Sequence, residues 1–117
     1  MTTATEIKVP RAVIDAERAA LGSTLIDNAA ARKALDMLQA EDFYRDDHRI
    51  IFNAIREVYQ RDKSIDVVTL SEFLKDNDTL GRLSQDDLTT GGGKYLFDLI
   101  HTVSSANHVE HYALLVK

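Results

Sequence analysis

The strongest hydrophobic pattern in the sequence runs through positions 46–61. At about 100° per residue, its apolar side chains cover half the circumference of a helix or more, which is wider than the stripe of an ordinary surface helix. Because a face this wide needs neighbours on two or three sides, we expect a central helix near residues 46–61. Its apolar positions are Ile50, Ile51, Phe52, Ala54, Ile55, Val58 and Tyr59.

Shorter segments with the same helical spacing occur on both sides of this stretch. Between them lie polar turns, and residues 79–93 have the composition of a loop. We expect Phe43 and Tyr44 to hold a short turn against the core. The further expected helices cover about 13–26, 29–38, 66–76, 94–102 and 107–116, with a break at 104–107 and the turn at 41–44.

Gly22 lies inside the first of these expected helices, where glycine costs about 1 kcal/mol relative to alanine. We interpret it as a place where a neighbouring helix comes close. A kink or an early end of the helix is the alternative. Asp27 and Asn28 then supply a stop followed by a start, because either side chain can accept hydrogen bonds from the first amides of the next helix. Asp66 is placed to cap another helix.

Length and composition favour an all-α domain. The chain has 117 residues, which fits one domain, and it contains one proline and few β-branched runs. We predict a compact orthogonal bundle of about six helices around the central helix near residues 46–61. Residues 1–9 form a flexible tail and residues 10–117 form the domain. The last helix reaches Lys117 without a stop signal, so we expect a longer parent chain.

Charge and cysteine content argue against several functions. The chain has 14 basic and 19 acidic residues and a net charge of −5, which is unsuited to gripping a phosphate backbone. It has no cysteine for disulfides or thiolate metal sites. No apolar run is long enough to span a membrane, and the first residues lack the apolar core of a signal peptide. We expect a cytoplasmic protein without membrane contact.

A glycine run followed by Lys94 invites comparison with a phosphate-binding loop. That loop needs glycine where Leu88 stands and serine or threonine where Tyr95 stands, so a loop without nucleotide is favoured. His108 and His111 lie three residues apart on the last expected helix, but no third ligand at a suggestive spacing supports a metal site. A small stand-alone metal enzyme built on these histidines is the alternative.

The remaining titratable residues have ordinary structural explanations. His48 falls on the apolar face of the central helix, where we expect a hydrogen-bonded histidine of the core or its rim. The acids near helix starts are explained by capping and by the helix dipole. These acids are Asp15, Glu17, Asp46, Asp47 and Asp66. We therefore predict no catalytic residue, no metal site and no cofactor within this chain.

Five groups of residues occur in a characteristic order. They are Ala16 and Glu17 with Leu21, Gly22 and Leu25 to Asp27; Glu41 to Tyr44 with His48 and Ile51 to Ile55; Ile65 to Leu70; Gly91 and Gly92 with Tyr95, Leu96 and Leu99; and Ala106 and Asn107 with Tyr112, Ala113 and Val116. Together they resemble the N-terminal domain of the replicative DNA helicases of the DnaB family, over residues 10–116. The stretch at 81–93 is longer than usual for that family, and its turn at 62–64 lacks the usual glycine and proline.

This resemblance implies a ring-shaped hexameric helicase that unwinds DNA at the replication fork, with ATP and Mg bound in a motor domain outside this chain. The present chain is then a non-catalytic head for assembly and primase docking, whose partners are primase and the other helicase subunits. DNA is contacted only through the hexamer.

Carried over by position, the residues that contact primase are Asp15 and Tyr95. Each also has a structural interpretation, Asp15 as an acid of the first helical turn and Tyr95 as a core residue. The alternatives for the whole chain are a helicase-binding helical domain of a primase and a stand-alone helical adaptor.

Overall fold

The computed structural model describes residues 10–76, 93–103 and 108–117. These residues form helices and contain no strand, so the predicted all-α class with six α-helices is confirmed. The predicted tail at 1–9, the loop up to residue 92 and the break at 104–107 lie outside the described residues. The elements are α1 (Arg11–Ile26), α2 (Asn28–Met37), the 3-10 helix η1 (Ala40–Asp42), α3 (Asp46–Asp62), α4 (Val67–Asp76), α5 (Gly93–Ile100) and α6 (Val109–Val116).

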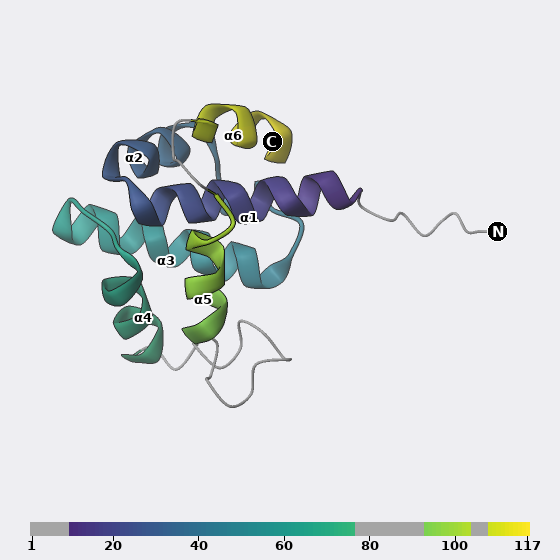
Figure 1. Ribbon diagram of the computed structural model, residues 1–117. Helices are drawn as coiled ribbons and strands as arrows, with labels where there is room; N and C mark the ends of the chain where they lie inside the picture. The colour runs from purple at the N-terminus through teal and green to yellow at the C-terminus, as the bar shows by residue number, and fades with distance from the viewer. Residues whose placement is uncertain (1–9, 77–92, 104–107) are drawn as a thin grey trace.

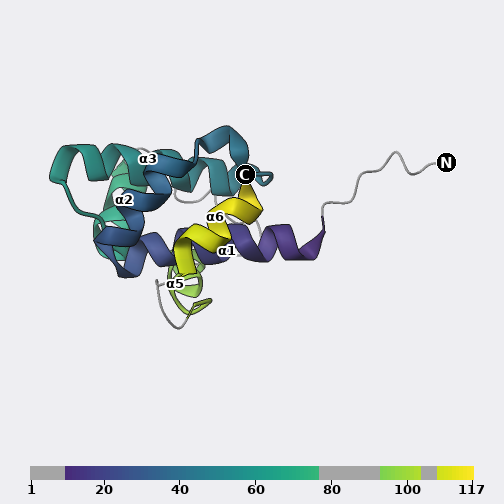
Figure 2. The same ribbon diagram turned by 90° about the horizontal axis from the view of Figure 1, so that it is seen from above.

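Most of the other helices pack against α1 (Figure 1). It packs against α2, α3, α5 and α6; Figure 1 shows α6 above α1 and both α3 and α5 below it, and Figure 2 shows α1 between α3 and α5 when seen from above. The central helix expected near residues 46–61 is present as α3, and it buries a wide face. It packs on α1, α4 and η1, so fewer helices meet at α3 than at α1. The small buried residues of α1 explain its position, because short side chains let neighbouring helix axes come close. They include Ala16, Ala19, Ala20 and Gly22.

Gly22 marks the closest of these approaches. A Cβ atom added at this position would lie 2.1 Å from the carbonyl oxygen of Leu99 in α5. The helix continues through Gly22 as far as Ile26. The interpretation of Gly22 as a site of close helix contact is therefore confirmed, and the alternative of an early helix end is wrong.

The predicted caps are also present. The Asp27 carboxylate accepts a hydrogen bond from the Ala29 amide at 2.8 Å, and the Asp66 carboxylate accepts one from the Thr69 amide at 2.8 Å. The side-chain oxygen of Asn28 accepts a hydrogen bond from the Ile65 amide at 3.0 Å. This last bond joins the start of α2 to the segment that leads into α4.

Three local expectations need correction. Helix α1 begins at Arg11, two residues before the predicted start, so Asp15 is its fifth residue and does not lie in the first turn. Tyr44 is 55% exposed and does not pin the turn, whereas Phe43 is fully buried and contacts the Phe52 ring with centroids 5.0 Å apart. Gly93, expected in a loop, begins α5. Helix starts shift easily because the first turn lacks internal hydrogen bonds.

Candidate functional site

Three titratable side chains from three helices meet inside the protein. Glu17 comes from α1, His48 from α3 and Tyr95 from α5. Glu17 and His48 have no exposed surface, and Tyr95 is 8% exposed. Because buried polar groups are costly unless they are hydrogen-bonded, the bonds among these three residues decide whether the cluster stabilises the fold.

His48 is bonded through both ring nitrogens. Its Nδ1 lies 2.6 Å from Glu17 Oε1, and its Nε2 lies 2.6 Å from Tyr95 Oη. An ionised carboxylate only accepts, so Nδ1–H donates to Glu17; in a neutral ring, Nε2 then accepts from the Tyr95 hydroxyl. The prediction of a hydrogen-bonded core histidine at position 48 is confirmed.

Glu17 also binds the backbone that leads into α3. Its Oε2 accepts a hydrogen bond from the Tyr44 amide, and its Oε1 receives a longer one from the Arg45 amide at 3.5 Å. Glu17 is the seventh residue of α1 and is fully buried, so its explanation as an acid at a helix start is wrong. The carboxylate instead fastens α1 to the beginning of α3.

The ring of Tyr95 carries two guanidinium groups. The Cζ atoms of Arg18 and Arg45 lie 5.5 Å and 5.7 Å from its centroid, within the range of cation–π attraction. Burial raises the pKa of Tyr95 to about 12, an effect that the charge of Arg45 partly opposes and that of Asp47 supports. The phenol is therefore protonated at neutral pH, as the bond to His48 requires.

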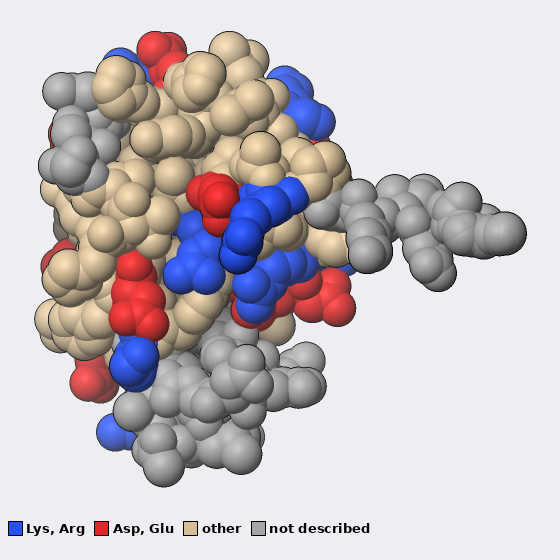
Figure 3. All heavy atoms as spheres, turned by 45° about the vertical axis from the view of Figure 1, so that its right-hand side comes forward, with Lys and Arg blue, Asp and Glu red and all other residues tan. Residues whose placement is uncertain are grey.

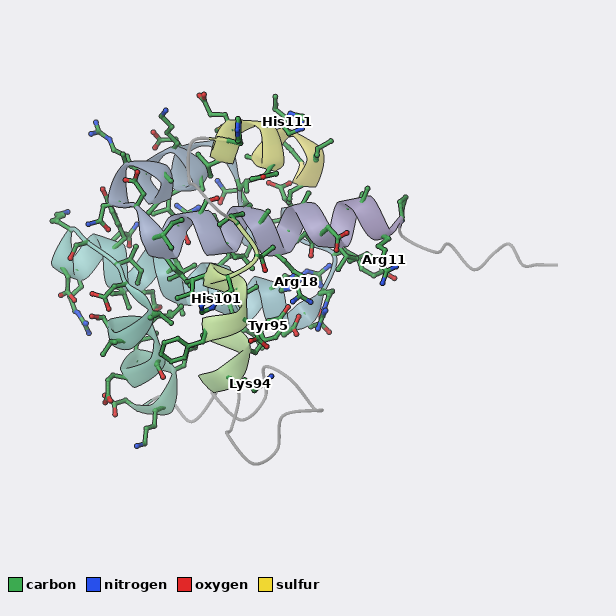
Figure 4. All side chains as sticks on the ribbon, viewed as in Figure 1. Arg11, Arg18, Lys94, Tyr95, His101 and His111 are labelled. Carbon is green, nitrogen blue, oxygen red and sulfur yellow. The ribbon has the colours of Figure 1, made fainter. Side chains whose placement is uncertain are left out.

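The two predicted partner-binding residues occupy different environments. Tyr95 is buried with its hydroxyl bonded to His48. Asp15 is exposed on α1. It borders a hollow of about 490 Å³ between α1, α6 and the segment after α5. The residues that line this hollow are Ala12, Asp15, Ala16, Ala19, Thr102, Tyr112 and Leu115. Figure 4 shows Arg18 on α1, near Tyr95 of α5.

The other histidines form no cluster. His108 and His111 are exposed, and His101 Nδ1 lies 2.8 Å from the Phe97 carbonyl oxygen. Within the part of the chain that the structure describes, no group of three His, Cys, Asp or Glu residues is arranged to hold a metal ion.

The glycine run is only partly visible, because its first two residues lie outside the described ranges. Lys94 forms an ion pair with Asp98 along α5, with 3.5 Å between Nζ and Oδ2.

Among the described residues, no helix is long and apolar enough to cross a membrane.

Sequence reasoning missed the roles of Glu17, Arg18 and Arg45. Glu17 belongs to one of the motifs that carry the family resemblance, which was a usable signal. Arg18 and Arg45 offered none, because they are far apart in the sequence and meet only when α1 packs beside the start of α3. The buried groups of the cluster are bonded to one another, so their chemistry is that of holding helices together.

The fold and this cluster define a small all-α domain in which three helices are joined by a buried polar network. Residues 9–117 match the family model described as "DnaB-like helicase N terminal domain", and the chain belongs to that family. The predicted resemblance is thus confirmed.

Relatives and a solved structure agree with this assignment. The chain is 36% identical to "Replicative DNA helicase DnaB" of Geobacillus stearothermophilus, over 94% of this chain and 23% of the relative. It is 32% identical to "Replicative DNA helicase DnaC" of Bacillus subtilis, over 100% of this chain and 24% of the relative. The crystal structure of the N-terminal domain of DnaB helicase from Mycobacterium tuberculosis superposes with a TM-score of 0.79 at 34% identity, covering 88% of this chain and 67% of that one. The chain spans about a quarter of the length of these curated relatives.

Proposed function

We propose that this chain is the N-terminal assembly and docking head of a hexameric replicative DNA helicase, and that it has no catalytic activity itself. The observation that carries the proposal is the family match over residues 9–117. Relatives described as replicative DNA helicases support it, since the chain aligns with about a quarter of their length. ATP, Mg and DNA unwinding then belong to a motor domain in the remaining part of such a protein.

The chemistry of the chain favours contacts with proteins over contacts with nucleic acid. Its net charge is −5, so it lacks the excess of cations that phosphate backbones require. The buried groups Glu17, His48 and Tyr95 bind one another, which leaves none of them free for reaction chemistry. The partners in this proposal are the other helicase subunits and primase, and the docking face includes Asp15 and the surroundings of Tyr95.

Catalysis and DNA binding are tested first, with the purified chain. We expect no ATP hydrolysis above a blank and no tight binding of single-stranded DNA at physiological salt. Turnover that persists through repeated purification would contradict a non-catalytic head.

Docking is tested by titrating the cognate primase into the chain in a calorimeter. We expect Asp15→Ala to weaken binding about fivefold or more, as truncation of an interface hot spot does. Asp36→Ala, which removes an exposed acid from α2, is the matched control and should leave the affinity within twofold. Equal affinities for the two variants would show that Asp15 does not belong to the interface. Absence of any heat of binding with the wild type would contradict primase docking.

A further inference from the structure

Positive side chains gather on one face of an otherwise acidic chain. Figure 3 shows blue lysine and arginine atoms grouped at the middle of the surface, with red acids at the edges of the group. Two of the arginines, Arg18 and Arg45, lie together over the ring of Tyr95. The excess of acids over the whole chain makes such a local concentration of guanidinium groups a candidate recognition surface.

The two guanidinium groups differ in what they bind. Arg45 forms a two-point ion pair with Asp47, with nitrogen–oxygen distances of 2.6 Å and 3.0 Å. Arg18 has no hydrogen bond or ion pair with any residue that the structure describes, and its guanidinium lies over the Tyr95 ring instead. Asp15 is one turn away on α1, but no ion pair joins the two residues in the described structure. Arg18 is thus a half-buried cation that has no anionic partner among the described residues.

The position of Arg18 is set in advance by the buried network. Its guanidinium lies against Tyr95, and the Tyr95 hydroxyl is fixed by His48, which is fixed by Glu17. A side chain already held in one place loses less conformational entropy when it binds, so it contributes more to affinity than a free surface arginine. A guanidinium has five N–H donors, and those that the Tyr95 ring does not cover can bind a planar anion.

We infer that Arg18, held on the Tyr95 ring beside the Arg45–Asp47 pair, receives a side-chain carboxylate from an acidic segment of a partner protein. This inference rests on the proposed function of the chain as a docking head and names the chemistry of its partner. A carboxylate matches the two-donor edge of a guanidinium. A nucleic-acid backbone needs several free cations, but Arg45 and Arg49 are already paired with Asp47 and Asp46. The one unpaired guanidinium among these described arginines, that of Arg18, therefore suits a single carboxylate better than a run of phosphates.

Tyr95 acts on a partner only through Arg18 in this arrangement. Its own surface is 8% exposed and its hydroxyl is already bonded, so Tyr95 is a positioning residue. This assignment explains how a buried tyrosine can influence docking. It also predicts that Tyr95→Phe changes partner affinity in the wild-type background but adds nothing once Arg18 is replaced, as expected for two residues that act through one contact.

The first experiment observes the arginine Nε–H signals by NMR while a capped hexaglutamate peptide is added to the chain. We expect the Arg18 signal to shift with saturation, whereas those of the remote Arg32 and Arg61 stay in place. A hexathymidylate of similar charge is the comparison probe and should shift Arg18 less. An unmoved Arg18 signal, or a stronger response to the oligonucleotide, would overturn the inference.

The second experiment measures the affinity of arginine variants for the cognate primase. We expect Arg18→Gln to weaken binding about tenfold. The affinity of Arg18→Lys should lie between those of the wild type and Arg18→Gln, because lysine keeps the charge but loses the two-donor edge. Arg32→Gln removes an exposed charge from α2 and should leave the affinity within twofold. Circular dichroism spectra of the variants should be identical to that of the wild type, since Arg18 is only half-buried and forms no hydrogen bond or ion pair with the described residues.

The outcomes separate the inference from the proposed function. If the wild type binds primase and Arg18→Gln binds equally well, the carboxylate contact is wrong and the docking head stands. If the wild type does not bind primase while hexaglutamate still shifts the Arg18 Nε–H signal, the carboxylate site stands and primase docking is wrong.

Discussion

The carboxylate of Glu17 illustrates why a buried polar residue depends on all of its partners at once. It accepts hydrogen bonds from the Tyr44 amide and from His48, and a weaker one from the Arg45 amide. Removing one member of such a set leaves the others buried and unsatisfied, which costs more than the bond itself contributes. The network therefore requires side chains with matching hydrogen-bond donors and acceptors as well as the right shape.

Glu17→Gln tests this requirement while preserving the size of the side chain. If its amide NH₂ faces the Tyr44 amide, two donors meet; if it faces His48, the ring must take its other tautomer and the Arg45 amide loses its acceptor. We expect the free energy of unfolding to fall by about 2–4 kcal/mol, measured by urea denaturation. The exposed Glu57→Gln on α3 is the control and should change it by less than about 0.5 kcal/mol. Equal stabilities for the two variants would show that the carboxylate is not required.

Tyr95 predicts a specific dependence of stability on pH. An unfolded tyrosine has a pKa near 10, and burial raises the pKa of Tyr95 to about 12 in the folded protein. Between these values the unfolded chain has lost the proton that the folded chain retains, so stability falls as the pH rises from about 10 to 12. Once the pH exceeds both pKa values, this difference has lowered the free energy of unfolding by about 2–3 kcal/mol.

The comparison that isolates Tyr95 uses Tyr95→Phe. This variant leaves His48 Nε2 without its donor, so we expect it to be less stable by about 1–3 kcal/mol at pH 8. Its stability should decline less steeply than that of the wild type between pH 10 and 12. Parallel declines, measured by urea denaturation at several pH values, would rule out a titrating Tyr95.

At the scale of elements, α1 is built to be approached from several sides. Its alanines and Gly22 provide little hydrophobic area each, but they let α5 and α6 lie close to its axis. The helix gains its stability from these neighbours because isolated helices of this length are marginal in water. Contact distance therefore matters more for α1 than helix propensity does.

Gly22→Ala tests the closeness of α1 and α5. In an exposed helix this change stabilises by roughly 1 kcal/mol, but here the new Cβ would lie 2.1 Å from the Leu99 oxygen. We expect destabilisation by about 1–3 kcal/mol or more, because α5 must move away. The exposed Asn53→Ala on α3 is the control for helix propensity and should be neutral or slightly stabilising. A stabilised Gly22→Ala would contradict the close approach.

At the scale of the whole molecule, contacts of α1 connect the two ends of the described chain. Helix α6 packs on α1 and α2, and α5 packs on α1 and α4. No helix group can separate without exposing core residues of α1. We therefore expect a single cooperative unfolding transition, as for most domains of this size.

A core deletion at the last helix tests this cooperativity. Val109 of α6 is 2% exposed, and Val109→Ala should lower the stability of the whole domain by about 1–3 kcal/mol. The midpoint should shift equally when unfolding is followed by helical circular dichroism and by tyrosine fluorescence. Leu114→Ala, at a position 66% exposed on the same helix, is the control and should have little effect. Early loss of part of the helical signal would indicate that α6 unfolds separately.

Local features of this fold were determined by the sequence alone. Helical spacing predicted all six helices, with ends within about two residues for most of them. Cap chemistry identified Asp27 and Asp66, and a glycine inside a helix indicated the close contact at Gly22. These features follow from interactions over one or two helical turns, which the order of residues specifies directly. The order and spacing of short motifs likewise identified the family.

The tertiary structure alone decided which helix faces meet. It placed α1 in contact with most of the other helices. It buried Glu17, an apparent helix-start acid, as the partner of His48, whose other ring nitrogen binds Tyr95. It also brought Arg18 and Arg45 onto one ring. These contacts join residues separated by tens of positions, and helical periodicity says which side of a helix is buried but not which neighbour covers it. The physical reason is that packing depends on the shapes of all the faces together, which no single stretch of sequence contains.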